Sequence, residues 1–142
     1  MINSYCIVLA DDDVLFRPLL KRLLSGEPGF EVAGDVGDGL ELLALLGGLR
    51  AAPQMAVLDI TMPNLGGIDT ASRIKAAYPE LKILIVSIHR EPEYVRKAVT
   101  AGADGYILKE DVETELFPAI QKIRSGEAYF SLRLVAEDLS EY

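Results

Sequence analysis

Residues 55–64 read Met55-Ala56-Val57-Leu58-Asp59-Ile60-Thr61-Met62-Pro63-Asn64. Four apolar residues lead directly into one carboxylate, and a Pro-Asn turn signal follows it. A short apolar run that ends at a turn signal is typical of a buried strand in a parallel sheet. In such sheets, ligands bind just beyond the carboxyl ends of the strands. We therefore expect Asp59 to lie at the edge of a sheet where chemistry takes place.

The composition is that of one globular domain. The chain has 142 residues, of which half are hydrophobic, and its formal net charge is −8. That length predicts a single domain, and the acidic charge argues against nucleic-acid binding by this chain itself. No apolar run approaches the ~20 residues of a membrane-spanning helix, so we expect no membrane contact. The single cysteine, Cys6, excludes an intramolecular disulfide and indicates a reducing, cytoplasmic location.

Apolar patterning alternates between strand and helix along the chain. Continuous apolar runs predict strands at residues 5–10, 30–33, 55–58, 82–87 and 105–109. Apolar residues at helical spacing predict helices at residues 14–25, 40–46, 68–77, 94–99 and 116–123. Pro118 is expected to shift the start of the last helix or to kink it. The alternation predicts an α/β fold with five helices, a doubly wound, flavodoxin-like parallel sheet of five strands in the order 2-1-3-4-5.

Polar residues end four of the five predicted strands. Asp11 and Asp12 follow the first strand, Asp59 follows the third, Ser87 ends the fourth and Lys109 ends the fifth. The expected strand order brings these side chains to one edge of the sheet. Three neighbouring carboxylates repel one another unless a divalent cation neutralises them, and Mg²⁺ prefers such hard oxygen ligands. We expect a cation held by Asp12 and Asp59, with Asp11 acting directly or through water.

A metal-bound phosphoryl group would complete this set of side chains. Lys109 can bind a phosphoryl oxygen as a point charge, and Ser87 can donate a hydrogen bond to another. Asp59 is a competent nucleophile toward phosphorus and would form an aspartyl phosphate. Each residue also has a commonplace explanation, since an acidic run usually caps a helix, and we expect Asp13 to do so. Their joint occurrence at strand ends is what favours phosphoryl transfer.

The sequence resembles the receiver domain of bacterial two-component response regulators. The resemblance spans residues about 5–125 and rests on Val8-Leu9-Ala10-Asp11-Asp12, Leu58-Asp59-Ile60-Thr61-Met62-Pro63, Ser87 and Gly105-Tyr106-Ile107-Leu108-Lys109. It implies that a sensor histidine kinase donates a phosphoryl group to Asp59 and that the face of helix 4, strand 5 and helix 5 then switches. The implied site comprises Asp11, Asp12, Asp59 and the main-chain carbonyl of Thr61 for Mg²⁺, Lys109 for phosphate, and Ser87 and Tyr106 as switch residues.

Finer features resemble the subgroup with a LuxR-type helix-turn-helix output domain. They are Leu15-Phe16-Arg17, Gly37-Asp38-Gly39, Glu93-Tyr94-Val95 and Gly126-Glu127-Ala128-Tyr129-Phe130-Ser131. By this resemblance, residues 1–125 form the receiver and residues 126–142 form a tail that begins a linker. The chain has no room for a helix-turn-helix, so we expect a piece of a longer protein rather than a natural single-domain protein. DNA binding and transcription regulation would then need the missing output domain, and a homodimer would form through receiver faces.

Four residues depart from the family pattern or stand outside it. Glu110-Asp111 follows the lysine where many receivers have proline, which puts the geometry of that loop in question. Ile88 follows Ser87 where the family often has a small residue, and it is expected to crowd the phosphoryl pocket. His89, the only histidine, is interpreted as a solvated loop residue.

The main alternative is a haloacid-dehalogenase-like, Mg²⁺-dependent phosphatase. Such enzymes also use a strand-end aspartate, and Asp11-Asp12-Asp13 contains their Asp-x-Asp motif. Leu15, however, stands where that motif requires threonine, and Asp59 is left without a role. A receiver, by contrast, is no multiple-turnover enzyme and catalyses only its own phosphorylation and dephosphorylation. A flavin-binding module is a weaker alternative, because the acidic loop after the first strand cannot cradle a phosphate.

Overall fold

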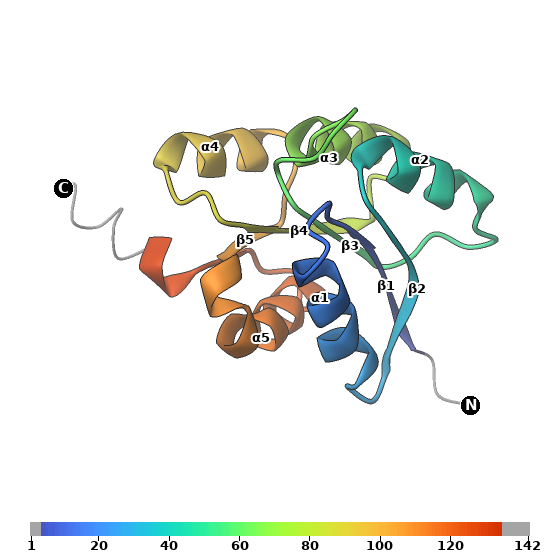
Figure 1. Cartoon of the computed structure of the whole chain (residues 1–142), viewed down its shortest axis with the longest axis horizontal. Helices are drawn as coiled ribbons and strands as arrows, with labels where there is room; N and C mark the ends of the chain where they lie inside the picture. The colour runs from blue at the N-terminus through green and yellow to red at the C-terminus, as the bar shows by residue number, and fades with distance from the viewer. Residues whose placement is uncertain (1–3, 135–142) are drawn as a thin grey trace.

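The computed structural model describes residues 4–134, which form a parallel sheet between two layers of helices (Figure 1). The strands, in the spatial order β2-β1-β3-β4-β5-β6, are β1 (Tyr5–Ala10), β2 (Phe30–Val36), β3 (Met55–Leu58), β4 (Lys82–Ser87), β5 (Gly105–Leu108) and β6 (Tyr129–Phe130). The helices are α1 (Phe16–Ser25), α2 (Gly39–Gly48), α3 (Gly67–Ala77), α4 (Pro92–Thr100), the 3₁₀ helix η1 (Lys109–Asp111) and α5 (Val112–Arg124). Every neighbouring pair of strands is parallel.

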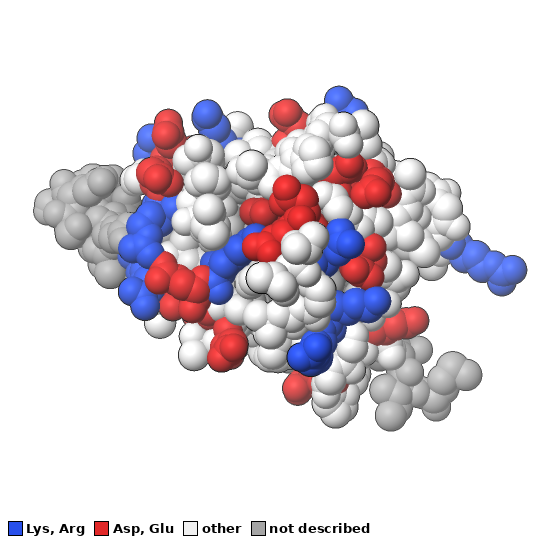
Figure 2. Space-filling model, viewed as in Figure 1, with Lys and Arg blue, Asp and Glu red and all other residues white. Residues whose placement is uncertain are grey.

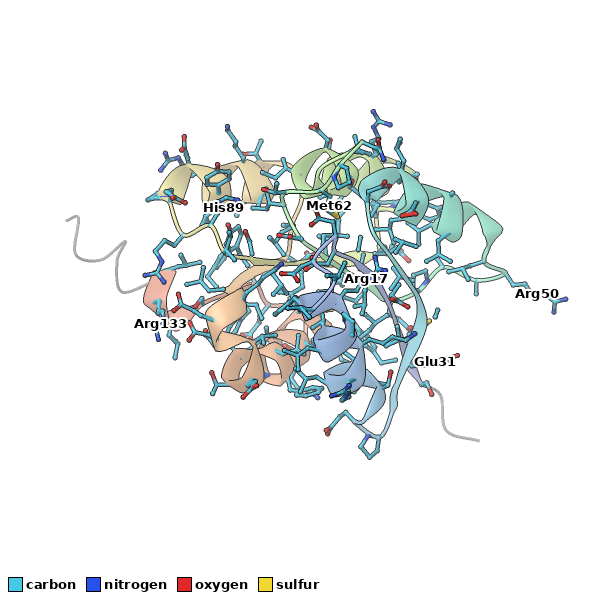
Figure 3. The ribbon with its side chains drawn as sticks, viewed as in Figure 1. Arg17, Glu31, Arg50, Met62, His89 and Arg133 are labelled. Carbon is cyan, nitrogen blue, oxygen red and sulfur yellow. The ribbon has the colours of Figure 1, made fainter. Side chains whose placement is uncertain are left out.

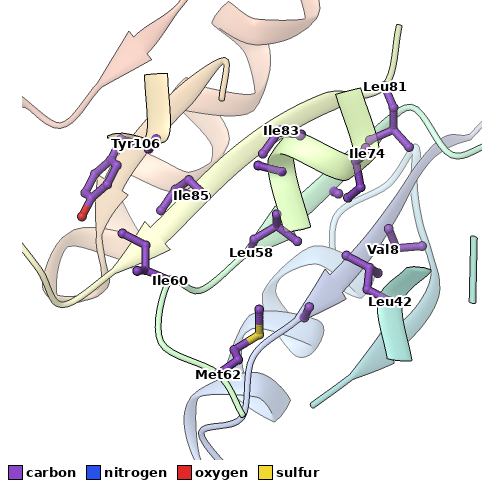
Figure 4. Close-up of a cluster of buried hydrophobic side chains, with 14 of the residues drawn as sticks. Val8, Leu42, Leu58, Ile60, Met62, Ile74, Leu81, Ile83, Ile85 and Tyr106 are labelled. Carbon is purple, nitrogen blue, oxygen red and sulfur yellow. The ribbon is translucent and has the colours of Figure 1, made fainter. Parts of the chain in front are cut away.

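Each face of the sheet has its own hydrophobic core. Helices α1 and α5 cover one face, and α2, α3 and α4 cover the other (Figure 1). Successive side chains of a strand point to opposite faces, so a strand buried on both sides must be apolar throughout. In β1, Val8 packs with the α2–α4 layer, whereas Ile7 and Leu9 pack with the α1–α5 layer. Figure 4 shows the first of these cores, in which Val8 lies near Leu42 and Tyr106 lies at the far end.

The predicted sheet of five strands is wrong by one strand. The order of the first five strands is as predicted, and β6 extends the sheet by pairing with β5. Only two residues, Tyr129 and Phe130, make up this strand, and two residues carry no periodic signal. Its position depends on hydrogen bonds to a distant segment, among them that of the Ser131 backbone N–H to the Tyr106 carbonyl at 2.9 Å.

The predicted number of five helices is also wrong by one. The fifth strand ends at Leu108 and not at Lys109, because residues 109–111 turn into η1 before α5 begins. This 3₁₀ turn contains Glu110 and Asp111, which follow the lysine at the place where many receivers have proline. Pro118 lies inside α5, which runs from Val112 to Arg124 without a break.

The division into a receiver at residues 1–125 and a tail at residues 126–142 stays a prediction. Strand β6 and the residues up to 134 continue the described structure beyond residue 125, and residues 135–142 of the predicted tail lie outside it. Within residues 4–134, no helix is long and apolar enough to cross a membrane.

Candidate functional site

The carboxyl ends of β1 and β3 bring three carboxylates together. The Asp59 backbone N–H donates to the Ala10 carbonyl at 3.0 Å, which holds Asp59 beside the residues that follow β1. One carboxylate oxygen from each of Asp11, Asp12 and Asp59 lies within 4.8 Å of the other two. Asp11 and Asp59 are 2% and 7% exposed, whereas Asp12 is open to solvent. Figure 2 shows acidic side chains gathered over the loop between β1 and α1.

Lys109 reaches back from the end of β5 into this cluster. Its Nζ atom lies 2.9 Å from Asp11 Oδ2 and 3.1 Å from Asp59 Oδ2, and 4.5 Å from the centre of the Phe16 ring. Burial disfavours the charged ammonium, but the hydrogen bonds and charges of Asp11 and Asp59 outweigh it and raise the pKa of Lys109. The lysine is therefore a fixed positive charge against the carboxylate that the sequence predicts as the nucleophile.

One ammonium does not neutralise the cluster. Burial, followed by the negative charge of Asp11, raises the pKa of Asp59, and Lys109 offsets this only in part. Three carboxylates against one ammonium leave two negative charges when all are ionised, which suits a divalent cation. The oxygen donors and their spacing fit Mg²⁺, whose chemistry favours carboxylates and retained water. The part of the Thr61 carbonyl in such a site stays a prediction.

The acidic residues that follow β1 have two different roles. The Asp13 carboxylate accepts hydrogen bonds from the backbone N–H groups of Leu15 at 2.9 Å and Phe16 at 3.0 Å. These hydrogen bonds lower the pKa of Asp13 and hold the turn that precedes α1. The N-cap position of α1 is Leu15, which makes no side-chain cap, so Asp13 supports this turn rather than occupying the predicted cap position. Asp11 and Asp12 are thereby left to face Asp59.

The loop from β3 to α3 is fixed by contacts that sequence reasoning missed. Gly67 begins α3 with its N–H donating to the Ile60 carbonyl at 2.8 Å, and an added Cβ would lie 1.9 Å from the Asp59 carbonyl oxygen. Asn64 adopts a left-handed backbone with φ of 65° and donates from Nδ2 to the Asp38 carboxylate at 2.6 Å. The Pro63-Asn64 turn and the Gly66-Gly67 pair were the sequence signals of this loop, and neither predicted these contacts.

Ser87 and Tyr106 lie on neighbouring strands beneath the site. Ser87 is fully buried, and its Oγ atom accepts a hydrogen bond from the His89 backbone N–H at 3.0 Å. Tyr106 pairs with Ile85 in the sheet, and its buried hydroxyl donates to the His89 carbonyl at 2.5 Å. Burial above all raises the pKa of Tyr106 to about 12, so the phenol keeps its proton and acts as a donor. Both residues therefore form hydrogen bonds with the backbone of His89, in the loop that follows β4.

His89 is not the solvated loop residue that the sequence predicted. Its side chain is half-buried, with Nε2 3.0 Å from Thr61 Oγ1 and the ring stacked on Tyr94 at 4.3 Å between ring centres. Figure 3 shows His89 below α4, on the side toward the sheet. The imidazole thus bridges the loop after β4 to the loop that carries Asp59.

The other departures from the family pattern are Ile88 and Glu110-Asp111. Ile88 is 71% exposed, and the expected crowding of the phosphoryl pocket stays a prediction. Glu110 forms an ion pair with Arg90, and Asp111 pairs with Arg133 at 2.8 Å, so both acidic residues of η1 have partners across the molecule.

Comparisons with known proteins agree on one family. Residues 7–121 match the response regulator receiver domain. The transcriptional regulatory protein DegU of Brevibacillus brevis is 35% identical over 140 residues, which are 99% of this chain and 58% of DegU. The oxygen regulatory protein NreC of Staphylococcus epidermidis is 31% identical over 137 residues, 96% of this chain and 62% of NreC. The chain thus spans about three fifths of the length of these relatives.

Solved structures extend the agreement to the fold. A LuxR-family two-component response regulator from Aurantimonas sp. has a TM-score of 0.89 and 31% identity, with 98% of each chain covered. A LuxR-family DNA-binding response regulator from Staphylococcus aureus has a TM-score of 0.77 and 29% identity, with 84% of this chain and 98% of that chain covered. These neighbours confirm the predicted LuxR-type subgroup. The chain belongs to the response regulator receiver domain family.

Proposed function

We propose that this protein accepts a phosphoryl group on Asp59, with Mg²⁺ as cofactor, from a sensor histidine kinase. The observation that carries the proposal is the position of the Asp59 carboxylate, which lies 3.1 Å from Lys109 and in a cluster with Asp11 and Asp12. A nucleophile between a fixed cation and a cation-binding carboxylate pair is the arrangement that phosphoryl transfer requires.

The Asp59 side chain is oriented for attack on phosphorus. The Ile60 N–H donates to Oδ1 at 2.8 Å, and Lys109 contacts Oδ2 at 3.1 Å. In the transfer, an Asp59 oxygen forms a new bond to phosphorus while the bond from phosphorus to the donor breaks, and the donor keeps that electron pair. Lys109 exchanges its contact with Oδ2 for one with a phosphoryl oxygen. Bound Mg²⁺ would neutralise charge on the phosphoryl oxygens.

A phosphoryl group on Asp59 offers Ser87 a new hydrogen-bond acceptor, and Tyr106 is linked to Ser87 through His89. The Ser87 hydroxyl can turn from the His89 N–H to donate to a phosphoryl oxygen. Tyr106 and Ser87 hold the same loop through His89, so this rearrangement changes the surface formed by α4, β5 and α5. We propose that this surface signals the phosphorylated state.

The wider role follows from the relatives. DegU is a transcriptional regulatory protein, and one solved LuxR-family neighbour is a DNA-binding response regulator. We propose that the receiver controls a DNA-binding output, belongs to a longer protein, forms a homodimer through receiver faces and works in the cytoplasm. Family membership leaves the haloacid-dehalogenase-like phosphatase without support.

Treatment of the protein with acetyl phosphate and Mg²⁺ tests this function. We expect intact mass spectrometry to show one added phosphoryl group per chain, because a single carboxylate occupies the reactive position. Release of many equivalents of product from p-nitrophenyl phosphate, without a stable adduct, would instead indicate a phosphatase.

The Asp12→Ala variant is expected to weaken Mg²⁺ binding by about 100-fold or more. Asp12 is the exposed carboxylate of the cluster and one of two expected direct ligands, so its loss leaves the cation too few oxygen donors. Isothermal titration calorimetry measures the affinity. Asp69→Ala, which removes an exposed carboxylate on α3, is the matched control and should bind Mg²⁺ as the wild type does. An unchanged affinity in Asp12→Ala would exclude this ligand assignment.

A further inference from the structure

Residues 129–134, here called the C-terminal segment, are held against α5 and β5 by a set of specific contacts. The segment contains β6, and Ser131 and Leu134 are 0% and 8% exposed. Leu134 packs into the same hydrophobic core as Tyr106. Phe130 and Tyr129 pack, partly buried, against the two cores, so polar contacts add to apolar packing in holding the segment.

One buried carboxylate of α5 collects three hydrogen bonds from this segment. Glu115 is 6% exposed and accepts from the Tyr129 hydroxyl at 2.7 Å, the Ser131 hydroxyl at 2.8 Å and the Leu132 N–H at 3.0 Å. Burial, and then the hydrogen bond to Glu115, raise the pKa of Tyr129 to about 12, so this hydroxyl remains a donor. Three hydrogen bonds thus join this one side chain to the segment, and hydrogen bonds to a carboxylate are stronger than neutral ones.

The same segment is attached to β5, the strand that carries Tyr106. The Ser131 N–H donates to the Tyr106 carbonyl at 2.9 Å, while the Tyr106 hydroxyl donates to the carbonyl of His89, whose ring contacts Thr61 in the loop after Asp59. Tyr106 therefore contacts the loop that follows β4 through its side chain and the segment through its backbone. Arg133 adds an ion pair with Asp111 of η1, directly after Lys109 and Glu110, at 2.8 Å (Figure 3 shows Arg133 on the segment).

We propose that the three hydrogen bonds of Glu115, here called the clasp, hold the C-terminal segment on the receiver. The phosphoryl state of Asp59 changes the strength of this clasp. The inference rests on the proposed function and adds to it the route by which the signal leaves the domain. A shift of Tyr106 on phosphorylation moves the carbonyl that Ser131 binds, so the segment that continues toward the rest of the protein senses the site. By linkage, a weaker clasp must in turn change the affinity of the site for a phosphoryl mimic.

Amide hydrogen exchange in the whole chain tests the clasp. In Glu115→Ala, we expect the Ser131 and Leu132 amides to exchange at least about tenfold faster, while the Leu9 and Val57 amides of the central strands keep wild-type rates. Tyr129→Phe, which loses one of the three hydrogen bonds, should show a smaller increase. Glu113→Ala removes an exposed carboxylate from the same helix and should leave all four amides unchanged. Wild-type exchange of Ser131 and Leu132 in Glu115→Ala would overturn the clasp.

Beryllofluoride with Mg²⁺ tests the coupling. We expect the mimic to change Ser131 and Leu132 exchange at least about threefold, and Tyr129→Phe to change the affinity for the mimic by a comparable factor. If the Lys109 and Ser87 resonances shift but the segment and the affinity do not respond, the coupling is wrong and the proposed function stands. If the mimic does not bind, the proposed function fails, and Tyr106→Phe still tests the coupling. That variant loses the hydrogen bond to His89, and unchanged Ser131 exchange in it would overturn the inference.

Discussion

Asp59→Asn is expected to incorporate no phosphoryl group from acetyl phosphate and Mg²⁺, where the wild-type chain takes up one. The amide cannot attack phosphorus as the carboxylate does, and it removes a negative charge from the cation site. The substitution keeps the shape of the side chain, and its amide oxygen can still accept the hydrogen bond that the Ile60 N–H donates to Asp59 Oδ1, whereas the contact of Lys109 with Oδ2 is lost. A loss of labelling therefore reports chemistry rather than unfolding. Intact mass spectrometry gives the stoichiometry of both proteins.

The control for this experiment is Asp69→Asn. Asp69 is an exposed carboxylate in the first turn of α3, the helix that begins directly behind Asp59. We expect this variant to be labelled like the wild type. Equal labelling of Asp59→Asn and the wild type would place the phosphoryl group on another residue and contradict the site described above.

Gly67→Ala is expected to destabilise the native state by about 3 kcal/mol and to reduce phosphoryl uptake. The new Cβ would lie 1.9 Å from the Asp59 carbonyl oxygen and 2.8 Å from the Asp59 carbonyl carbon, and these backbone atoms cannot rotate away. The start of α3 must therefore move off the strand end that presents Asp59. Urea unfolding followed by far-ultraviolet circular dichroism measures the change in the free energy of unfolding.

A second glycine provides the comparison. Gly47 lies in the last turn of α2, and an added Cβ there meets nothing within 4 Å. Gly47→Ala should leave the free energy of unfolding within about 1 kcal/mol of the wild type, on the stabilising side, because alanine favours the helix. If Gly67→Ala were as stable as Gly47→Ala, the close approach of α3 to Asp59 would have no energetic importance.

The sequence predicted the parts of the fold that depend on local patterns. The apolar runs of β1 and β4 and the polar residue at the end of each are visible in a single stretch of chain, and topology rules then place them in order. The convergence of Asp11, Asp12, Asp59 and Lys109 followed from that order, because parallel strands end at the same edge.

The features that sequence analysis missed depend on contacts between distant segments. The pairing of β6, the bridge from His89 to Thr61 and the hydrogen bonds of Glu115 join residues that are 14 to 28 positions apart. Glu115 has the sequence appearance of a surface glutamate in an amphipathic helix. Only the return of the chain at Tyr129 and Ser131 buries it, and no periodicity reports that return.

The most direct test of the central claim is the NMR spectrum of the protein with and without beryllofluoride and Mg²⁺. The claim is that occupation of Asp59 is transmitted through Ser87 and Tyr106 to the surface of α4 and β5. We expect the mimic to shift the resonances of the Tyr106 ring and of the α4 amides together with those of the Asp59 loop. Shifts confined to the Asp59 loop, with the Tyr106 ring and α4 unchanged, would contradict it.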